Sequence, residues 1–418
     1  MSKKYCIPAH SEVKQSAYSL TAIQVTGATS LPVLNSSIQL FHQYGLATAF
    51  WILFFGNIVI WLFAFSIVQM SANTTKNTLD NVRDYLGSTG SWTVGIVLLI
   101  STLAYYVTQT NLTTEIILSL FPFKEGYAIN QFFQFGVVLG IVSVLSIMPG
   151  INGLRWLATI AFPIIMLAFL GLLFFIPSSN PLTVTILPSL GSIAIALGTS
   201  LSVAVDYPTF FQHSKSKKSS IIAVTAIQII TFLIGIGGLY LGQYIGATHN
   251  LSGWDVVIND ALFVKILFFL MVVLSCLCVN TVNVYSASIA WELIAPKILL
   301  GKKEYTILGL GLTSFFILTT GILSVEFLLT LTAGPLTNLC FILVCGYLGK
   351  LIVGELEARD KLIFFIGWLI GSAITVIARL QSELNIYLLL SGLFLSISIV
   401  VLVFFIKKFK SEFLSIKK

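Results

Sequence analysis

Charged residues are scarce in this chain: they make up 9% of its 418 residues, against about a quarter in soluble domains. Hydrophobic residues make up 57%, and the mean hydropathy is +0.97. A water-soluble fold could not cover so much apolar surface. The composition therefore excludes a soluble domain and predicts an all-α membrane protein.

Sequence motifs for catalysis and energy coupling are also missing. The chain has no GxxxxGK[ST] loop, so no ATPase subunit is implied, and it has neither an HExxH motif nor a nucleophile elbow. Its five cysteines show no CxxC or Cys/His spacing that would hold a metal, and they imply no disulfide framework. No filter repeat or ring of charges indicates a channel. These absences disfavour an enzyme, a sensor and a channel, and they favour a secondary transporter with no cofactor beyond a coupling ion.

Apolar windows long enough to cross about 30 Å of hydrocarbon occur twelve times. They lie at 17–37, 46–70, 91–120, 130–148, 154–176, 185–207, 220–245, 262–292, 305–322, 326–349, 362–379 and 386–407. The first window follows a polar start and has no small-residue cleavage site, so we expect it to remain as a span.

The basic residues are distributed as membrane topology requires. With a cytoplasmic N-terminus, all but three of the 23 Lys and Arg lie in cytoplasmic segments, the exceptions being Lys124, Lys265 and Arg379. The positive-inside rule then predicts a multi-pass protein of the cell (inner) membrane with both termini cytoplasmic. The net charge of +7 indicates contact with the lipid bilayer rather than with nucleic acid, and it leaves the oligomeric state open.

Two windows, five apart, each contain a glycine followed closely by Thr, Ser and Leu. The glycines are Gly27, shortly before Pro32, and Gly198. An odd offset turns the second copy upside down, which predicts a five-plus-five inverted repeat with interrupted helices. Repeat one would cover about 17–176, repeat two about 185–349 and two accessory helices about 362–407, all in a single transporter domain. The alternative interpretation is that small residues simply allow close helix packing.

The chain resembles the nucleobase:cation symporter family, and within it the bacterial cytosine permeases. The most specific mark is the stretch from Asn280 to Ser288 (NTVNVYSAS), which is similar to the permeases' Asn-Asp-Asn-Ala-Leu-Tyr run. The other marks are Gly27, Gly56-Asn57, Gly90-Ser91-Trp92, Asp206-Tyr207 and Gly334-Pro335. The resemblance implies alternating access and uptake of a nucleobase or related heterocycle together with a cation.

A flat heterocycle needs an aromatic face for stacking and polar groups along its edge. The resemblance places Tyr105 at the family's stacking tryptophan and Thr102 at its glutamine, with Gln109 one helical turn from Tyr105. It also places Asn280 at the family's substrate-binding asparagine, and Asn283 is a weaker candidate. For these asparagines the alternative is an interhelical hydrogen bond, worth about 0.6 kcal/mol in a membrane bundle.

The second break supplies further candidates for the substrate's edge. Backbone groups of Gly198 and Thr199 would be exposed there if the helix unwinds. The family's second stacking aromatic aligns with Leu197, so a sandwich of two rings is not expected. This departure keeps a second hypothesis open, in which the same fold carries an amino acid, a vitamin or an osmolyte.

The coupling ion is the point where the chain departs most from the family. The resemblance assigns sodium to carbonyls of Gly27 and Ser30, a carbonyl near Ser275, and two hydroxyls whose positions are here Cys278 and Val279. A thiol and an isopropyl group offer no hard oxygen ligand, so Na⁺ is doubtful. H⁺ is the alternative, with Glu115, Asp206 and Glu292 as candidate carriers.

Asp206 is also a candidate gating residue. It closes the sixth window at a helix C-terminus, where the helix dipole disfavours an anion, so we expect a cationic partner such as Lys215. The alternative is an ordinary carboxylate at the membrane interface.

Overall fold

The structure is a computed structural model, and it describes residues 14–28, 31–72, 76–120, 128–175, 201–243, 262–295, 303–320, 324–381 and 386–416. In these ranges the regular secondary structure is helical, apart from an isolated bridge between Gln15 and Ser214. The predicted all-α class is therefore confirmed. Ser30, Gly198 and Thr199 lie outside the described residues.

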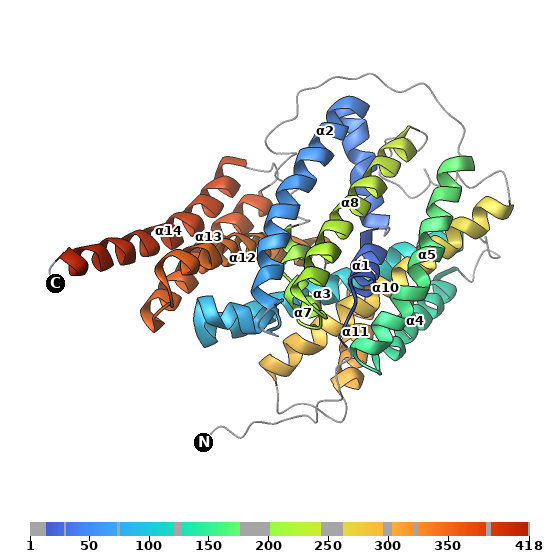
Figure 1. Ribbon diagram of the computed structural model, residues 1–418. Coiled ribbons are helices and arrows are strands. Elements are labelled where there is room, and N and C mark those ends of the chain that lie inside the picture. The colour runs from blue at the N-terminus through green and yellow to red at the C-terminus, as the bar shows by residue number, and fades with distance from the viewer. Residues whose placement is uncertain are drawn as a thin grey trace.

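Most of the predicted window 185–207 lies outside the described residues, and the helices elsewhere overlap the predicted windows. They are α1 (Ala17–Ala28), α2 (Leu31–Ser71), α3 (Thr78–Leu120), α4 (Ala128–Ile147), α5 (Ile151–Phe175), α7 (Tyr207–Phe211), α8 (Lys217–Gly242), α10 (Leu262–Ile294), α11 (Lys303–Thr319), α12 (Val325–Val353), α13 (Ala358–Leu380) and α14 (Ile386–Ile416) (Figure 1). Within the described ranges, eight helices are long and apolar enough to cross a membrane, and two shorter apolar segments lie in α4 and α11. The chain is thus a multi-pass membrane protein by length and composition of its helices.

Two glycines bend helices that otherwise run on. Gly45 has a φ of 73° inside α2, and Gly87 has a φ of 75° inside α3. Residues with a side chain rarely adopt these values, so glycine makes both joints possible. The first joint separates the segment that continues window one from the segment that forms window two. The second separates the span in α3 from a short polar helix, from Thr78 to Leu86, which hydropathy did not predict.

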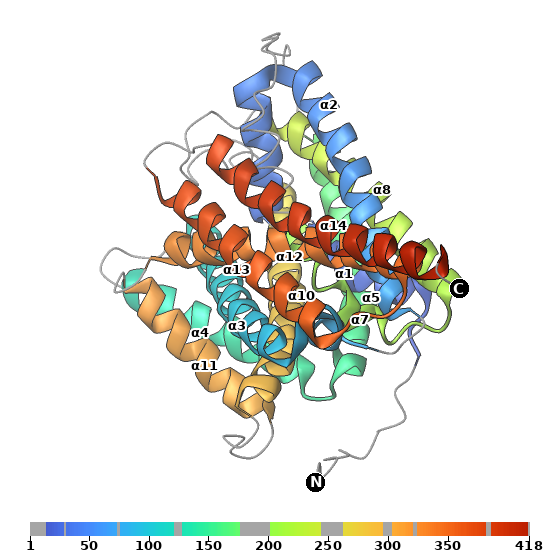
Figure 2. The same ribbon diagram turned by 90° about the vertical axis from the view of Figure 1, so that its left-hand side faces the viewer.

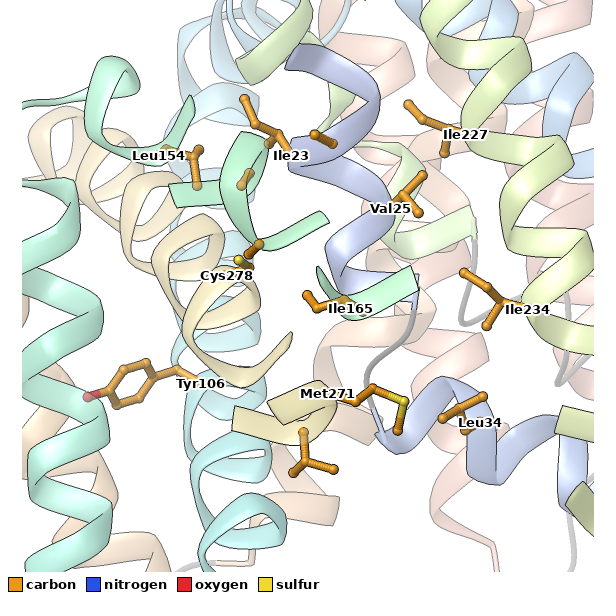
Figure 3. Packing of buried hydrophobic residues seen from close by; sticks show 14 of the residues in the cluster. Ile23, Val25, Leu34, Tyr106, Leu154, Ile165, Ile227, Ile234, Met271 and Cys278 are labelled. Atoms are coloured by element: carbon orange, nitrogen blue, oxygen red, sulfur yellow. The ribbon is translucent and has the colours of Figure 1, made fainter. Parts of the chain in front are cut away.

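The helix α1 lies in the interior of the bundle. Ile23 and Val25 are fully buried, and Figure 3 shows α1 between α5, α8 and α10. On one side, α2 packs along α8, where glycines permit close approach: a Cβ at Gly238 would lie 2.7 Å from the Ser37 Cβ. The position of α1 therefore brings its backbone against α10.

The last three helices form the opposite side of the molecule. In Figure 1, α12, α13 and α14 lie together, away from α4, α5 and α11, and in Figure 2 α13 and α14 face the viewer. Two hydrogen bonds fasten α13 to α12: Trp368 Nε1 donates to the Pro335 carbonyl at 2.9 Å, and Asn338 Nδ2 donates to Thr375 Oγ1 at 3.2 Å. Because α13 also packs on α3, it is part of the bundle rather than an appendage.

Candidate functional site

The contact between α1 and α10 gathers the residues proposed to hold a cation. The Ser275 hydroxyl donates to the Thr26 carbonyl at 2.9 Å, and both groups are buried. Cys278 also forms a side-chain hydrogen bond with Thr26. A Cβ added to Gly27 would lie 3.5 Å from Val279 Cγ2. The predicted neighbours therefore do meet across these two helices.

The donor set at this contact does not suit sodium. The Ser275 hydroxyl already bonds the protein's own carbonyl, the Cys278 thiol is a soft ligand, and Val279 fills the space beside Gly27 with methyl groups. Figure 3 shows Cys278 on the side of α10 that faces α1. The hydrogen bond from Ser275 to the Thr26 carbonyl joins α10 to α1 directly, at the place where a bound cation would have joined them.

The contact between α3 and α10 contains Asn280, which is fully buried. Its Nδ2 donates to Thr110 Oγ1 at 2.9 Å and lies 3.6 Å from Cys276 Sγ. Its Oδ1 is buried without a hydrogen-bond partner among the described residues. Asn280 thus forms the interhelical bond that was the alternative interpretation, and it also keeps an acceptor for a ligand. Asn283 Nδ2 is likewise buried and unpartnered.

The three α3 candidates differ in what they offer. Thr102 is buried, and its hydroxyl donates to the carbonyls of Leu98 and Leu99 in its own helix, so its hydrogen is already used. Gln109 is buried one turn beyond Tyr105. Its backbone carbonyl lies 3.7 Å from Cys276 Sγ of α10, which donates to it. Gln109 therefore lies between Tyr105 and the Asn280 contact, whereas Thr102 is a weak edge partner.

Tyr105 has two polar neighbours that sequence reasoning did not connect with it. Its hydroxyl forms a hydrogen bond with the Ser202 side chain and interacts electrostatically with the guanidinium of Arg379, near the end of α13. Arg379 is partly buried, and its Nε has no hydrogen-bond partner within the described ranges. In the sequence, Arg379 was considered only as a basic residue near the end of a span, so nothing there indicated that it lies close to Tyr105.

Asp206 has three hydroxyl partners instead of the expected cation. Thr78 Oγ1 and Thr209 Oγ1 donate to its Oδ1 at 2.9 and 2.7 Å, and Ser286 Oγ of α10 donates to Oδ2. The predicted pairing with Lys215 is wrong: Lys215 is exposed, and the ion pairs formed within the described residues do not include Asp206. Three short hydroxyl side chains reach a buried carboxyl at lower desolvation cost than a lysine.

Among the candidate proton carriers, the structure separates Asp206 from Glu115. Asp206 is enclosed between α3, α7 and α10, whereas Glu115 is exposed on the surface of α3. Neighbouring Tyr285 of α10 contacts His213 Nε2 through its hydroxyl at 3.0 Å. Polar contacts thus tie the end of α10 to the segment that carries Asp206.

The fold is similar to those of three solved structures. The chain is similar to Mhp1, a nucleobase-cation-symport-1 family transporter solved in a closed conformation with bromovinylhydantoin bound. The identity is 15%, the similarity covers 93% of this chain and 92% of Mhp1, and the TM-score is 0.70.

The other two structures are a Na⁺-coupled sialic acid symporter and a manganese transporter of Eremococcus coleocola. The symporter is 12% identical, with 94% and 90% of the two chains covered and a TM-score of 0.68. The manganese transporter is 12% identical, with 97% of each chain covered and a TM-score of 0.60. No family model and no curated protein matches the sequence. At these identities the similarity establishes the fold.

Proposed function

We propose that the protein is a secondary active transporter that imports a nucleobase-like heterocycle with a coupled cation by alternating access. The observation that carries the proposal is the similarity to Mhp1, which extends over nearly the whole of both chains. The heterocycle would lie between α3 and α10, with Tyr105 as the stacking ring. Gln109 and the free Oδ1 of Asn280 would serve as edge groups. Asn283, Gly198 and Thr199 complete the proposed substrate-binding set.

The same proposal includes the topology. Twelve spans would cross the inner membrane with both termini in the cytoplasm, arranged as two inverted repeats of five and two accessory helices. The packing of α1 against α10 supports this plan. Asp206 and its three hydroxyl partners would form the gate at the cytoplasmic end of α10.

We assign the coupling role to H⁺ rather than Na⁺. The Ser275 hydroxyl and the Val279 methyl groups take the places beside Thr26 and Gly27 at which a cation would need oxygen ligands. Asp206 is the ionisable group best placed to exchange a proton as the gate opens, since its hydroxyl partners come from three different segments.

Proteoliposomes containing the purified protein test the proposal directly. Radiolabelled cytosine, uracil, purines and hydantoins are offered with a sodium gradient and a proton gradient imposed separately. We expect saturable uptake of at least one heterocycle that is driven by the proton gradient and insensitive to sodium. Absence of uptake of all of them under both gradients would reject the proposal.

A second candidate keeps the fold and changes the solute to an amino acid, a vitamin or another small compound. It is favoured by the similarity to a sialic acid symporter and a manganese transporter, which shows that one fold carries unlike solutes. A thermal-shift screen across a mixed library separates the candidates, because a ligand that binds only the folded state raises its melting temperature.

A further inference from the structure

The side chain of Arg379 points into the bundle. Thr375 lies one helical turn earlier on the same face of α13, and it is buried against Asn338 of α12. The Nε of Arg379 is itself buried. The Trp368 bond to Pro335 holds the helix in this rotation, with the face that carries Thr375 packed against α12.

Within the described residues, no carboxylate forms an ion pair with this guanidinium. The ion pairs formed within the described ranges involve Lys76, Lys350 and Lys407, not Arg379. Its polar neighbour is the hydroxyl of Tyr105, which also bonds Ser202. A partly buried cation without an anion is costly in a membrane protein, and such residues mark ligand sites or ion paths.

We propose that Arg379 is a substrate-binding residue and that the substrate carries an anionic group, a carboxylate or a deprotonated imide, next to Tyr105. This inference rests on the proposed transport function and adds a charge to the substrate class. The planar guanidinium offers a fork of N–H donors that matches a carboxylate, and the anion supplies the missing counter-charge. The helix α13, predicted as accessory, thereby contributes to substrate choice.

Matched pairs of ligands test the inference. Uracil is compared with orotate, which adds a carboxylate to the same ring, and hydantoin with hydantoin-5-acetate. Amino acids and N-acetylneuraminate extend the panel to carboxylates without such a ring. Affinities are measured by thermal shift and calorimetry for the wild type, Arg379→Gln and Arg379→Lys. The control variant Lys265→Gln removes another basic side chain near a helix end without touching Tyr105.

The wild type should bind the anionic member of a pair more tightly than the neutral one. Arg379→Gln should weaken anion binding roughly tenfold or more while changing neutral binding less than about twofold. Arg379→Lys keeps the charge but not the fork, so it should recover only part of the anion affinity. Without ligand, Arg379→Gln should melt no lower than the wild type, because Arg379 forms no ion pair within the described residues.

Other results separate this inference from the transport proposal. Equal loss for both members of a pair, no loss, or full rescue by Lys would overturn the role of Arg379 and leave heterocycle transport standing. Arg379-dependent binding of a carboxylate without binding of any heterocycle would support the inference and reject the heterocycle. Absence of binding across the whole panel would reject both.

Discussion

Asp206 and Arg379 are two partly buried ionisable residues with opposite surroundings. Asp206, beside the N-terminal end of α3, accepts hydrogen bonds from Thr78, Thr209 and Ser286. Arg379, beside the middle of the same helix, has a buried Nε without a partner in the described part of the chain. Within the described residues, both carboxyl oxygens of the first group accept hydrogen bonds, whereas the Nε of the second donates none.

The difference is the one expected between a gate, proposed for Asp206, and a ligand-binding residue, proposed for Arg379. A carboxyl surrounded by hydroxyls from three segments holds those segments together, and opening that end must break the bonds. A guanidinium without an anion gains most from a ligand that brings one. In the proposals made above, Asp206 closes one end of the protein and Arg379 binds the substrate.

The largest effect on stability is expected from removing the Asp206 carboxyl. Asp206→Ala leaves three buried hydroxyls without their acceptor and should lower the free energy of unfolding by on the order of 3 kcal/mol. Chemical unfolding in detergent measures this loss. Asp206→Asn, which keeps the shape and one acceptor, should cost less. Equal stability of Asp206→Ala and the wild type would show that the hydroxyl cluster does not hold this end closed.

Asn280 tests the intermediate case, because one atom of its amide is bonded and another is free. Asn280→Ala should weaken substrate binding roughly tenfold or more by removing the free acceptor. Thr110→Val is the matched control, since it removes the interhelical partner of Asn280 and, besides that, a bond to the Tyr106 carbonyl of its own helix. The interhelical part should be worth about 0.6 kcal/mol. If both variants weakened binding equally, Asn280 would act through packing and not through the substrate.

The contact of α1 with α10 tests whether the protein's own groups replace an ion. Transport by the wild type should change less than about twofold when sodium is exchanged for choline, because the available ligands are not hard oxygens. Cys278→Ser combined with Val279→Thr restores two hydroxyls beside Gly27. Sodium-dependent uptake or thermal stabilisation is then expected from the double variant, with Val279→Ile as the control that adds no oxygen. Strong sodium dependence of the wild type would contradict the assignment.

The smallest effect is expected away from the site, at the start of α13. Lys407 of α14 lies 2.5 Å from Asp360 Oδ2, and that oxygen also accepts a hydrogen bond from the Glu357 backbone N–H. Lys407→Met should lower stability by about 1 kcal/mol or less and leave ligand affinity unchanged. Melting temperatures at low and high salt check this, since the pair should be weaker at high salt. A change in ligand affinity would show that this end of α13 is coupled to Arg379.

Most of the fold could be predicted, because hydropathy reports directly where helices run. The fifth and eighth windows, 154–176 and 262–292, correspond to α5 and α10 within a few residues. The polar helix before Gly87 was missed because only its contacts explain it: Thr78 bonds Asp206, and the Ser91 hydroxyl donates to the Leu79 carbonyl. Such a segment carries no hydrophobic signal.

Neighbours in the candidate site could be predicted only where both residues lie in stretches that resemble the nucleobase:cation symporter family. Gly27 and Val279 were expected to be neighbours, and a Cβ added to Gly27 would lie 3.5 Å from Val279 Cγ2. The partners of Asp206 were not predicted correctly, since a charge suggests an opposite charge and hydroxyl residues are too common to single out. Arg379 was interpreted as a topology signal because position along a helix does not reveal which neighbour a side chain meets.

The bend at Gly87 allows the short helix before it to rotate relative to the rest of α3. Thr78 lies nine residues from this joint, about 13 Å along the helix axis at 1.5 Å per residue. A swing of about 10° at Gly87 would move the Thr78 hydroxyl by about 2 Å, which is enough to break its bond to Asp206. A small rotation of the backbone at Gly87 can therefore break the hydrogen bond between Thr78 and the Asp206 carboxyl.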